Sequence, residues 1–391
     1  MSQDDRAQTI GDLGEFPLIE RIRGFLAGTA PPVGVILGIG DDAALLRPEP
    51  GWDYAVTCDV QINGRHFVRA WTDMRGIGRR AMNVNLSDLA AMGAEPRYAL
   101  VSLGLDPDLT LGDLEDLYGG FEDALAGTEA GIIGGNISAT GPDWFCDITL
   151  IGRVEAGQAL TRTGARPGDR ILVTGSPGRS AAGLALLQRT AGAAVPEAHP
   201  WAATLVDAFL RPIARVGVGR LLVSINRGDL PAGFNNRSHD EPSKAAGTET
   251  PRPGEAMTLP VTAAIDLSDG LFGDLTRLCE ASGVRAALDV SRLPADPALE
   301  EAAALIGRGR WEWTLSPGDD YELLMTVAPA AAKRLADLVR RECGVAVTDI
   351  GMIAAPPDGR SPTPAAGLIE LVGLPPGAAA PSGWDHLRPP S

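Results

Sequence analysis

The chain has 391 residues, of which 45% are hydrophobic, and its formal net charge at pH 7 is −16. One typical domain needs fewer residues, so we expect a globular protein with two domains, each with its own apolar core. The acidic charge argues against nucleic acid or an anionic membrane as the main partner, because both attract basic surfaces.

The cysteines and the N-terminus bear on the compartment. The four cysteines are widely spaced, with no CxxC pair and no histidine-rich spacing of the kind that binds zinc. The N-terminal residues lack a basic region followed by an apolar run, so we expect no secretory signal. No apolar run reaches the length of a membrane span. These features favour a reduced, cytoplasmic setting.

The first half of the chain alternates between predicted helices and strands. Residues 1–13 are polar and expected to be flexible. Residues 31–46 combine a β-branched run, a glycine turn with two aspartates and a second apolar run, which is typical of strand, turn and strand. Thr110 is a plausible N-cap for a helix that runs to a glycine stop. Two further helices are expected over 14–26 and 74–92, and further strands over 54–64, 98–105, 132–141 and 144–154.

A Pro-Gly-Asp turn opens the second half, and we predict the domain boundary near residue 157. Residues 226–258 are poor in apolar side chains and rich in Gly, Pro and charge, so we expect a mobile or disordered surface insertion. The alternation predicts two α/β or α+β domains, 14–157 and 158–391. The elements expected in the second domain are a strand over 171–175 with a helix after it, a strand and helix over 261–281, and helices from 296 and over 330–342, with apolar segments 282–294, 313–327 and 345–353 between and after them.

Aspartates in apolar surroundings are the main chemical signal. Asp88 lies in the otherwise apolar helix MNVNLSDLAAMG, at i+3 from Asn85, so the two side chains share a helix face. Three more stretches carry acids, namely GIGDDAALL, TCDVQINGRHF and AIDLSDGLFGDL. Buried like charges that lie close together require cations between them, and carboxylates suit hard divalent ions, which in turn attract phosphates.

Each of these residues also has a purely structural interpretation. Gly and Asp are the commonest turn residues, which accounts for Asp41 and Asp42. Asp269 lies at the entrance of a helix, where an N-cap explains it, although a bound phosphate would meet the same positive helix end. His66 alone is more often a hydrogen-bonded structural residue than a catalytic one.

The glycine loops GGNIS and GSPGRSAAG are of the type that lets backbone N–H groups approach phosphate. Neither is a Walker GxxxxGK[ST] loop and neither matches GxGxxG, so both are weak signals. The chain also lacks the GxSxG elbow of a serine hydrolase, a zincin helix and a kinase HRD loop.

Taken together in chain order, these motifs resemble the thiamine-monophosphate kinase family, within the aminoimidazole ribonucleotide synthetase-like superfamily. The resemblance covers nearly the whole chain except the insertion. It implies an N-terminal ATP- and magnesium-binding domain whose sheet pairs with its twin in a dimer, followed by a C-terminal domain. The matching motifs are GEFPLIERI, GIGDDAALL, TCDVQINGRHF, VNLSDLAAMGAEPR, GGNIS, ALTRTGARPGD, GSPGRSAAGL, AIDLSDGL, SPGDDYELL and GWDHL.

The resemblance implies ATP-dependent phosphorylation of thiamine monophosphate to thiamine diphosphate with Mg²⁺ ions. Phosphoryl transfer needs alignment of donor and acceptor and neutralisation of their charge, so Asp59, Asp88 and Asp266 are the catalytic candidates. The implied magnesium positions are Asp42, Thr57, Cys58, Asp59, Asp88, Asn136, Asp266 and Asp269; ATP would lie near Tyr118, Gly135, Asn136, Arg162 and Ser268, and the substrate near His66, Asp319 and Trp384.

Three residues depart from the family pattern. Asn136 replaces a metal-binding aspartate and Cys58 replaces a threonine, both at one family metal position, and a thiol is a poor ligand for a hard ion. Asp319 replaces a glutamate, which shortens its reach. Two alternatives to an active kinase therefore stay open: a catalytically impaired homologue that binds a nucleotide or phosphometabolite, and a kinase or ligase of the same superfamily with another substrate.

Overall fold

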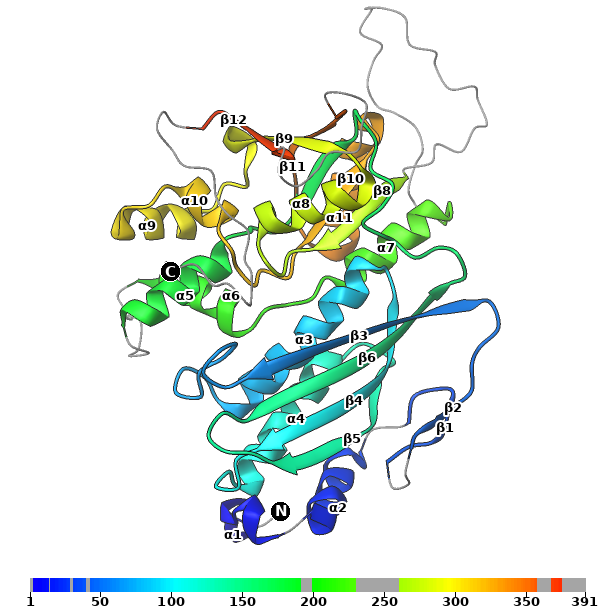
Figure 1. The fold of residues 1–391 in the computed structure, drawn as a ribbon, viewed down its shortest axis with the longest axis vertical. Coiled ribbons are helices and arrows are strands. Elements are labelled where there is room, and N and C mark those ends of the chain that lie inside the picture. The colour runs from blue at the N-terminus through cyan, green and yellow to red at the C-terminus, as the bar shows by residue number, and fades with distance from the viewer. Residues whose placement is uncertain are drawn as a thin grey trace, which may run out of the picture.

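The structure is a computed structural model that describes residues 3–13, 15–28, 31–39, 43–190, 199–229, 260–356 and 367–374. These residues form two domains, drawn one above the other in Figure 1. The prediction of a two-domain protein with mixed helices and sheets is confirmed. Within the described residues, no helix is both long and apolar enough to cross a membrane.

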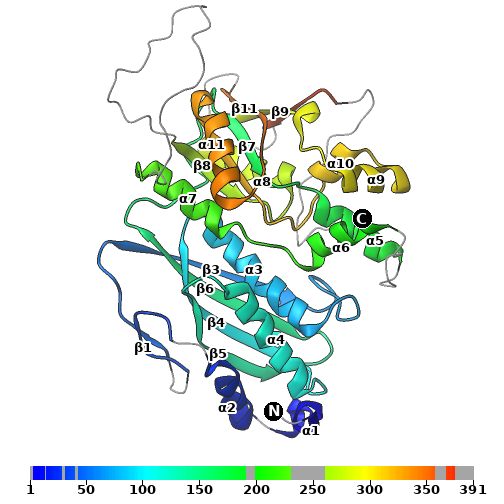
Figure 2. The ribbon, with the colours of Figure 1, turned by 180° about the vertical axis from the view of Figure 1, so that it is seen from behind.

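The N-terminal domain is built on a four-stranded sheet in the order β3-β6-β4-β5. Neighbouring strands are antiparallel except β4 and β5, which are parallel. Helices α3 and α4 cover one face of this sheet, as the view from behind shows (Figure 2). The elements are α1 (Gln3–Ala7), α2 (Glu15–Leu26), β1 (Val35–Leu37), β2 (Leu45–Leu46), β3 (Trp52–Ile62), α3 (Met74–Ala91), β4 (Glu95–Leu105), α4 (Leu111–Leu125), β5 (Gly131–Ala139) and β6 (Phe145–Glu155).

Both sheet-covering helices begin where local hydrogen bonding dictates. Asp73 caps α3 by accepting the Gly76 N–H at 2.6 Å. Thr110 caps α4 in a reciprocal capping box with Asp113, which confirms the predicted N-cap. Residues 1–13, expected to be flexible, include α1 and a 3-10 turn whose Ile10 is buried.

The C-terminal domain has a six-stranded sheet in the order β12-β9-β11-β7-β10-β8, antiparallel except for β12 with β9. Helices α7 and α11 pack on one face and α8 on the other, and α5, α6, α9 and α10 form a separate helical cluster (Figure 1). The elements are β7 (Arg170–Thr174), α5 (Arg179–Arg189), α6 (Pro200–Leu210), α7 (Val216–Asn226), β8 (Val261–Asp266), α8 (Leu271–Ser282), β9 (Arg285–Asp289), α9 (Pro297–Ile306), α10 (Arg310–Leu315), β10 (Leu323–Val327), α11 (Pro329–Cys343), β11 (Val347–Ala354) and β12 (Ile369–Val372).

One continuous apolar core joins the domains, because α3 packs against α7 as well as against its own sheet. The two helices approach closely at Gly219, where an added Cβ would overlap the carbonyl oxygen of Ala90. Helix α3 also contacts β8, and the acidic residues described next lie where the two elements meet.

Several predictions fall outside the described residues. They concern Asp41, Asp42, Trp384 and most of the 226–258 insertion, of which residues 230–258 are not described. All four cysteines are free thiols, and only Cys58 among them is exposed.

Candidate active site

Helix α3 and strand β3 bring three polar side chains together on the helix-covered side of the sheet. The Thr57 hydroxyl donates a hydrogen bond to the Asp88 carboxylate. The backbone N–H of Asp59 donates to Asn85 Oδ1 at 3.1 Å, so Asn85 fixes the strand that carries Asp59. The i, i+3 relation of Asn85 and Asp88 thus directs both side chains at β3, as the helical spacing indicates.

The C-terminal domain adds a third acid to this group. Asp266 is the last residue of β8 and is only 2% exposed. The Ser87 hydroxyl of α3 donates to Asp266 Oδ2 at 2.7 Å. Residues from both domains therefore form one acidic cluster, defined here as Asp59, Asp88 and Asp266.

The acidic cluster is electrostatically strained. Burial, followed by the charge of Asp88, raises the pKa of Asp59 to about 7. The same two causes raise the pKa of Asp266 to about 7, although the Ser87 hydrogen bond and the charge of Arg162 act in the opposite direction. A cation placed among these carboxylates would relieve this strain.

The donor set fits Mg²⁺ in chemical type. Among the described residues, no group of three or more His, Cys, Asp or Glu side chains has the geometry of a finished metal site. Mg²⁺ is usually held by one or two carboxylates together with waters and substrate phosphates, not by an all-protein cage. The acidic cluster therefore supplies part of such a site.

Arg162 and Ser268 lie beside the acidic cluster. Arg162 is exposed, and its charge acts on Asp266. Ser268 follows Asp266 by two residues and is partly exposed.

Asp269 forms an ion pair with Arg277 of α8, and its backbone N–H donates to Asp274 Oδ2 at 3.0 Å.

Cys58 and Asn136 occupy a different place from the acidic cluster. Both are exposed, and Cys58 donates to Asp147 Oδ1 at 3.1 Å. They belong to β3 and β5, the two edge strands of the sheet. Three strand spacings separate these strands, which amounts to about 14 Å. Within one chain, therefore, these two residues lie apart, whereas the resemblance expects them at one metal position of a dimer.

Two of the residues expected near ATP have structural reasons to be where they are. An added Cβ at Gly135 would overlap the backbone carbonyl of Val101 on β4, so the sheet itself requires glycine there. Tyr118 is 3% exposed and packs against Phe25 and Phe121. Its ring is covered in this structure and presents almost no surface to a ligand.

Of the residues expected near the substrate, the structure describes His66 and Asp319. His66 Nδ1 accepts the backbone N–H of Ile62 at 3.0 Å, where β3 ends. Asp319, in the turn before β10, forms an ion pair with the buried Arg80 of α3.

The loop GSPGRSAAG does not present a free helix end to a phosphate. Asp320 is partly buried there and accepts the N–H groups of Gly178 and Ser180, at 2.7 and 3.1 Å, at the start of α5. An internal carboxylate thus takes the place that the sequence offered to a phosphate.

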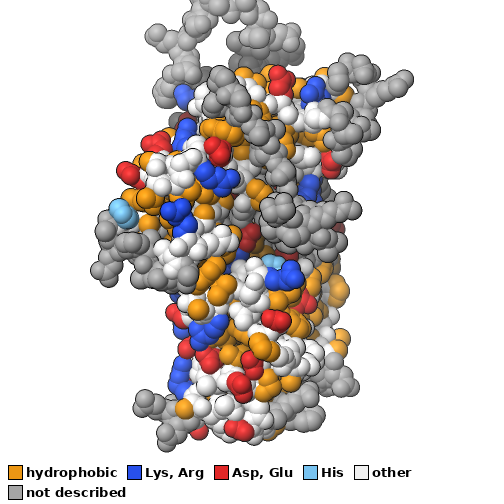
Figure 3. Space-filling view, turned by 60° about the vertical axis from the view of Figure 1, so that its left-hand side comes forward, with side chains coloured by type: hydrophobic (Ala, Val, Ile, Leu, Met, Phe, Trp, Pro, Cys, Tyr) orange, Lys and Arg blue, Asp and Glu red, His pale blue; other side chains and the backbone are white. Residues whose placement is uncertain are grey.

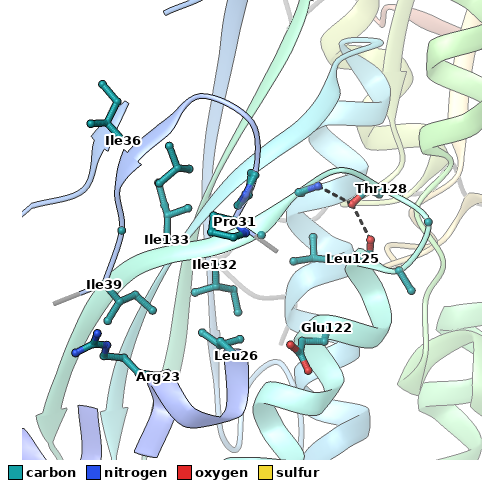
Figure 4. A pocket seen from close by; sticks show the side chains of 17 residues that line it. Arg23, Leu26, Pro31, Ile36, Ile39, Glu122, Leu125, Thr128, Ile132 and Ile133 are labelled. Carbon is teal, nitrogen blue, oxygen red and sulfur yellow. Dashed lines mark hydrogen bonds between the residues drawn. The ribbon is translucent and has the colours of Figure 1, made fainter. Parts of the chain in front are cut away.

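A mostly apolar pocket of about 440 Å³ lies at the β5 edge of the sheet, between α2, α4 and the segment that contains β1. Figure 4 shows Ile36 and Ile133 on one side, Leu125 on the other, and Ile132 and Leu26 between them, with Arg23 and Glu122 among the lining residues. Because the acidic cluster is next to β3, at the opposite edge of the sheet, the pocket and the cluster do not form one site within a chain.

Sequence reasoning did not assign Ser87, Arg80 or Gln61 to the site. Ser87 adjoins Asp88 and was visible as a polar residue in an apolar helix. Arg80 pairs with a residue 239 positions away, a contact that helical periodicity cannot indicate.

On the surface, basic and acidic side chains are interspersed over the described part of the face in Figure 3, in keeping with the argument against a nucleic-acid partner.

Comparison with known families agrees with this architecture. The model of the AIR synthase related protein, N-terminal domain, matches residues 40–154, and that of the C-terminal domain matches residues 248–361. These matches place the fold in the class of AIR synthase related proteins.

Relatives that match over most of their length identify the family within this class. The thiamine-monophosphate kinase of Escherichia coli strain K12 is 35% identical over 350 residues, covering 88% of this chain and 92% of the relative. The crystal structure of thiamine-monophosphate kinase from Stenotrophomonas maltophilia K279a has 33% identity and a TM-score of 0.71, covering 92% of this chain and 97% of that one. The structure of AaThiL complexed with AMPPCP and TMP has 26% identity and a TM-score of 0.65, covering 96% and 97%. The chain belongs to the thiamine-monophosphate kinase family.

Proposed function

We propose that this protein transfers the γ-phosphoryl group of ATP to thiamine monophosphate and so forms thiamine diphosphate. The observation that carries the proposal is the acidic cluster, which takes Asp59 and Asp88 from one domain and Asp266 from the other. Relatives 35% identical to this chain are thiamine-monophosphate kinases, which supports the choice of reaction and acceptor.

Mg²⁺ is the cofactor we propose for the acidic cluster. Asp59, Asp88 and Asp266 would hold it with the Thr57 hydroxyl, and Asp42 and Asp269 are further candidates. When bound, the ion neutralises phosphate charge and aligns the donor and acceptor phosphates.

The chain's own residues prepare this site. Thr57 orients the Asp88 carboxylate, Ser87 orients that of Asp266, and Asn85 fixes the backbone at Asp59. Because these contacts orient the carboxylates, little reorganisation is needed during the reaction. We assign Arg162, which is exposed and whose charge acts on Asp266, a contact with an ATP phosphate, and we assign Ser268 a neighbouring contact.

No general base is required for this reaction. A phosphate monoester has a second pKa of about 6, so its attacking oxygen is already anionic at neutral pH. The protein then only has to align two phosphates and balance their charge. The aspartates therefore act through charge and position. His66, Asp319 and Trp384 are the residues we assign to the thiamine portion.

We further propose a homodimer formed by the open face of the N-terminal sheet, the face opposite α3 and α4. Val56 and Val60 are exposed apolar side chains on this face. In one chain the β5 residues Gly135 and Asn136 lie about 14 Å from β3, so a second copy is needed to bring a β5 edge to a β3 edge. The apolar pocket of Figure 4, which adjoins β5, would then take the nucleotide base.

The direct test is to incubate the purified protein with ATP, MgCl₂ and thiamine monophosphate and to quantify thiamine diphosphate by chromatography. We expect product only when all three are present and none after chelation of Mg²⁺. Thiamine and a nucleoside monophosphate serve as alternative acceptors. Product from one of those instead would indicate another substrate within the same superfamily.

A second candidate function is a nucleotide-binding homologue without efficient transfer, which the replacements at Cys58 and Asn136 favour. Tight ATP or ADP binding by folded protein, with no thiamine diphosphate formed, would establish it. Asn136→Asp combined with Cys58→Thr should raise the rate of a weakened enzyme and leave a binding protein inactive. We place either activity in the cytoplasm, where free thiols such as those of this chain stay reduced.

A further inference from the structure

Arg80 is a buried charged side chain that the proposed reaction does not use. It lies on α3, two turns before Asp88, and is 2% exposed. A guanidinium stays ionised in proteins, so burying it is costly unless every donor finds a partner.

The partners of Arg80 come from three different elements. Nε donates to Gln61 Oε1 of β3 at 3.2 Å, Nη1 donates to the Phe209 carbonyl at the end of α6, and Nη2 pairs with Asp319 Oδ2. The guanidinium also lies over the Phe209 ring, 4.8 Å from its centroid. One side chain thus ties the N-terminal sheet to two segments of the C-terminal domain.

The turn that contains Asp319 lies next to the acidic cluster. Tyr321, two residues on, is buried and has the left-handed backbone angle φ of 51°, which non-glycine residues rarely adopt. Its hydroxyl lies within electrostatic range of Asp59, Asp266 and Arg80. The turn is therefore held in one unusual conformation between Arg80 and the cluster.

We propose that Arg80 is a positioning residue for the acceptor. It fixes the Asp319 carboxylate and holds the 317–321 turn of the C-terminal domain in one position relative to α3. This inference rests on the proposed function, in which Asp319 contacts the thiamine portion. One Asp319 oxygen is held by Arg80, which leaves the other to face a ligand, and Asp319 is 34% exposed on its side chain.

Arginine suits this position better than lysine. The three partners lie in different directions, and a guanidinium offers donors in a fixed planar fork, whereas an ammonium is a point charge. Arg80→Lys should therefore keep the pairing with Asp319 but lose the bonds to Gln61 and Phe209, and behave between wild type and Arg80→Met.

The test compares Arg80→Met with Arg79→Met, a matched control on the adjacent residue. Arg79 is 44% exposed and pairs with Asp123 on the surface. We expect Arg80→Met to raise KM for thiamine monophosphate about tenfold or more, with a much smaller change in KM for ATP. Arg79→Met should match wild type in both. Equal changes in the two KM values, or no change, would overturn the proposal.

A double-mutant cycle separates positioning from general support of the fold. If Arg80 acts through Asp319, the effects of Arg80→Met and Asp319→Asn on KM for thiamine monophosphate should not multiply in the double variant. Fully multiplicative effects would contradict the proposal. If Arg80→Met does not fold, Arg80→Lys and Asp319→Asn complete the comparison, and a normal KM in both would also overturn it.

Hydrogen exchange distinguishes failure of this inference from failure of the proposed function. The backbone amides of residues 318–322 should exchange faster in Arg80→Met than in Arg79→Met or wild type, whether or not thiamine monophosphate is the substrate. Unchanged exchange would refute the positioning role even if the enzyme is active. If Arg80→Met exchanges faster but the wild-type protein forms no thiamine diphosphate, the positioning role is upheld and the proposed acceptor is refuted.

Discussion

The charge of Asp88 lowers the stability of the folded protein and serves ligand binding. Its charge raises the pKa values of both Asp59 and Asp266. Asp88→Asn removes this repulsion and keeps an oxygen for the Thr57 hydroxyl. We expect the variant, without Mg²⁺, to gain about 1 kcal/mol and so a few degrees in unfolding midpoint. In the kinase assay it should lose at least about two orders of magnitude in kcat.

The measurement is a thermal unfolding series in chelator and in MgCl₂. Wild type should be stabilised by the ion more than Asp88→Asn, since binding to the folded state raises its stability. Asp116→Asn, a partly exposed carboxylate on α4 paired with Arg6, is the control and should retain the wild-type response. A variant that is less stable in chelator and equally stabilised by Mg²⁺ would count against the acidic cluster as the metal site.

Asp320 makes a pH prediction at the same scale. Burial raises its pKa to about 7. The hydrogen bonds from the N–H groups of Gly178 and Ser180 lower this pKa, whereas the charges of Glu322 and Asp319 raise it further. Because the folded-state pKa lies above the unfolded one, stability falls as pH rises from about 4 to about 7, by at most about 4 kcal/mol.

Asp320→Asn removes this dependence, although it gives up one of the two N–H contacts. The difference in unfolding midpoint, variant minus wild type, should become more positive between pH 5 and pH 8. Comparing the two proteins at each pH cancels the other titrating groups. A difference that is constant, or that falls with pH, would show that Asp320 is ionised throughout.

At the scale of elements, the capping box of α4 was readable from sequence and is testable. Thr110 Oγ1 accepts the Asp113 N–H at 3.0 Å, and Asp113 Oδ2 accepts the Thr110 N–H at 3.1 Å. Thr110→Ala should cost about 1 kcal/mol in the free energy of unfolding, whereas Thr110→Ser should cost much less. Urea titration of the three proteins checks this, and equal losses in the two variants would assign the effect to the threonine methyl group instead.

Other elements carry no such local signal. Helix α7, VGVGRLLVSIN, has two glycines and several β-branched residues, so local propensity does not favour a helix. Its glycine at 219 is explained by the close approach to Ala90 of α3. Strand β12 is four residues long and depends on pairing with β9. Tertiary contacts, which a single sequence does not display, determine both.

At the scale of the whole molecule, the motifs indicated which acids to consider but not how the domains share them. Asp88 and Asp266 are separate signals in the sequence, and the hydrogen bond from Ser87, next to Asp88, to Asp266 links positions 179 residues apart. The resemblance placed Cys58 and Asn136 at one metal position, whereas the strand order sets them on opposite edges of a sheet. Order within a sheet is a long-range property, so motif spacing could not reveal this separation.

That separation leads to a prediction about assembly. If a second copy brings its β5 edge to the β3 edge of the first, the wild-type protein should be a dimer and a monomeric variant should be folded but inactive. Val56, 63% exposed at the centre of β3, lies on the open face, so Val56→Asp should separate the copies by burying unpaired charge at the interface. Ile213→Asp alters an equally exposed side chain, at 66%, outside that sheet and should leave the dimer intact.

Light scattering after size exclusion gives the oligomeric state, and the kinase assay gives the activity of each species. An active wild-type monomer would show that one chain completes the site alone, and the distance between Cys58 and Asn136 would then mean that only one of them lies near the phosphates.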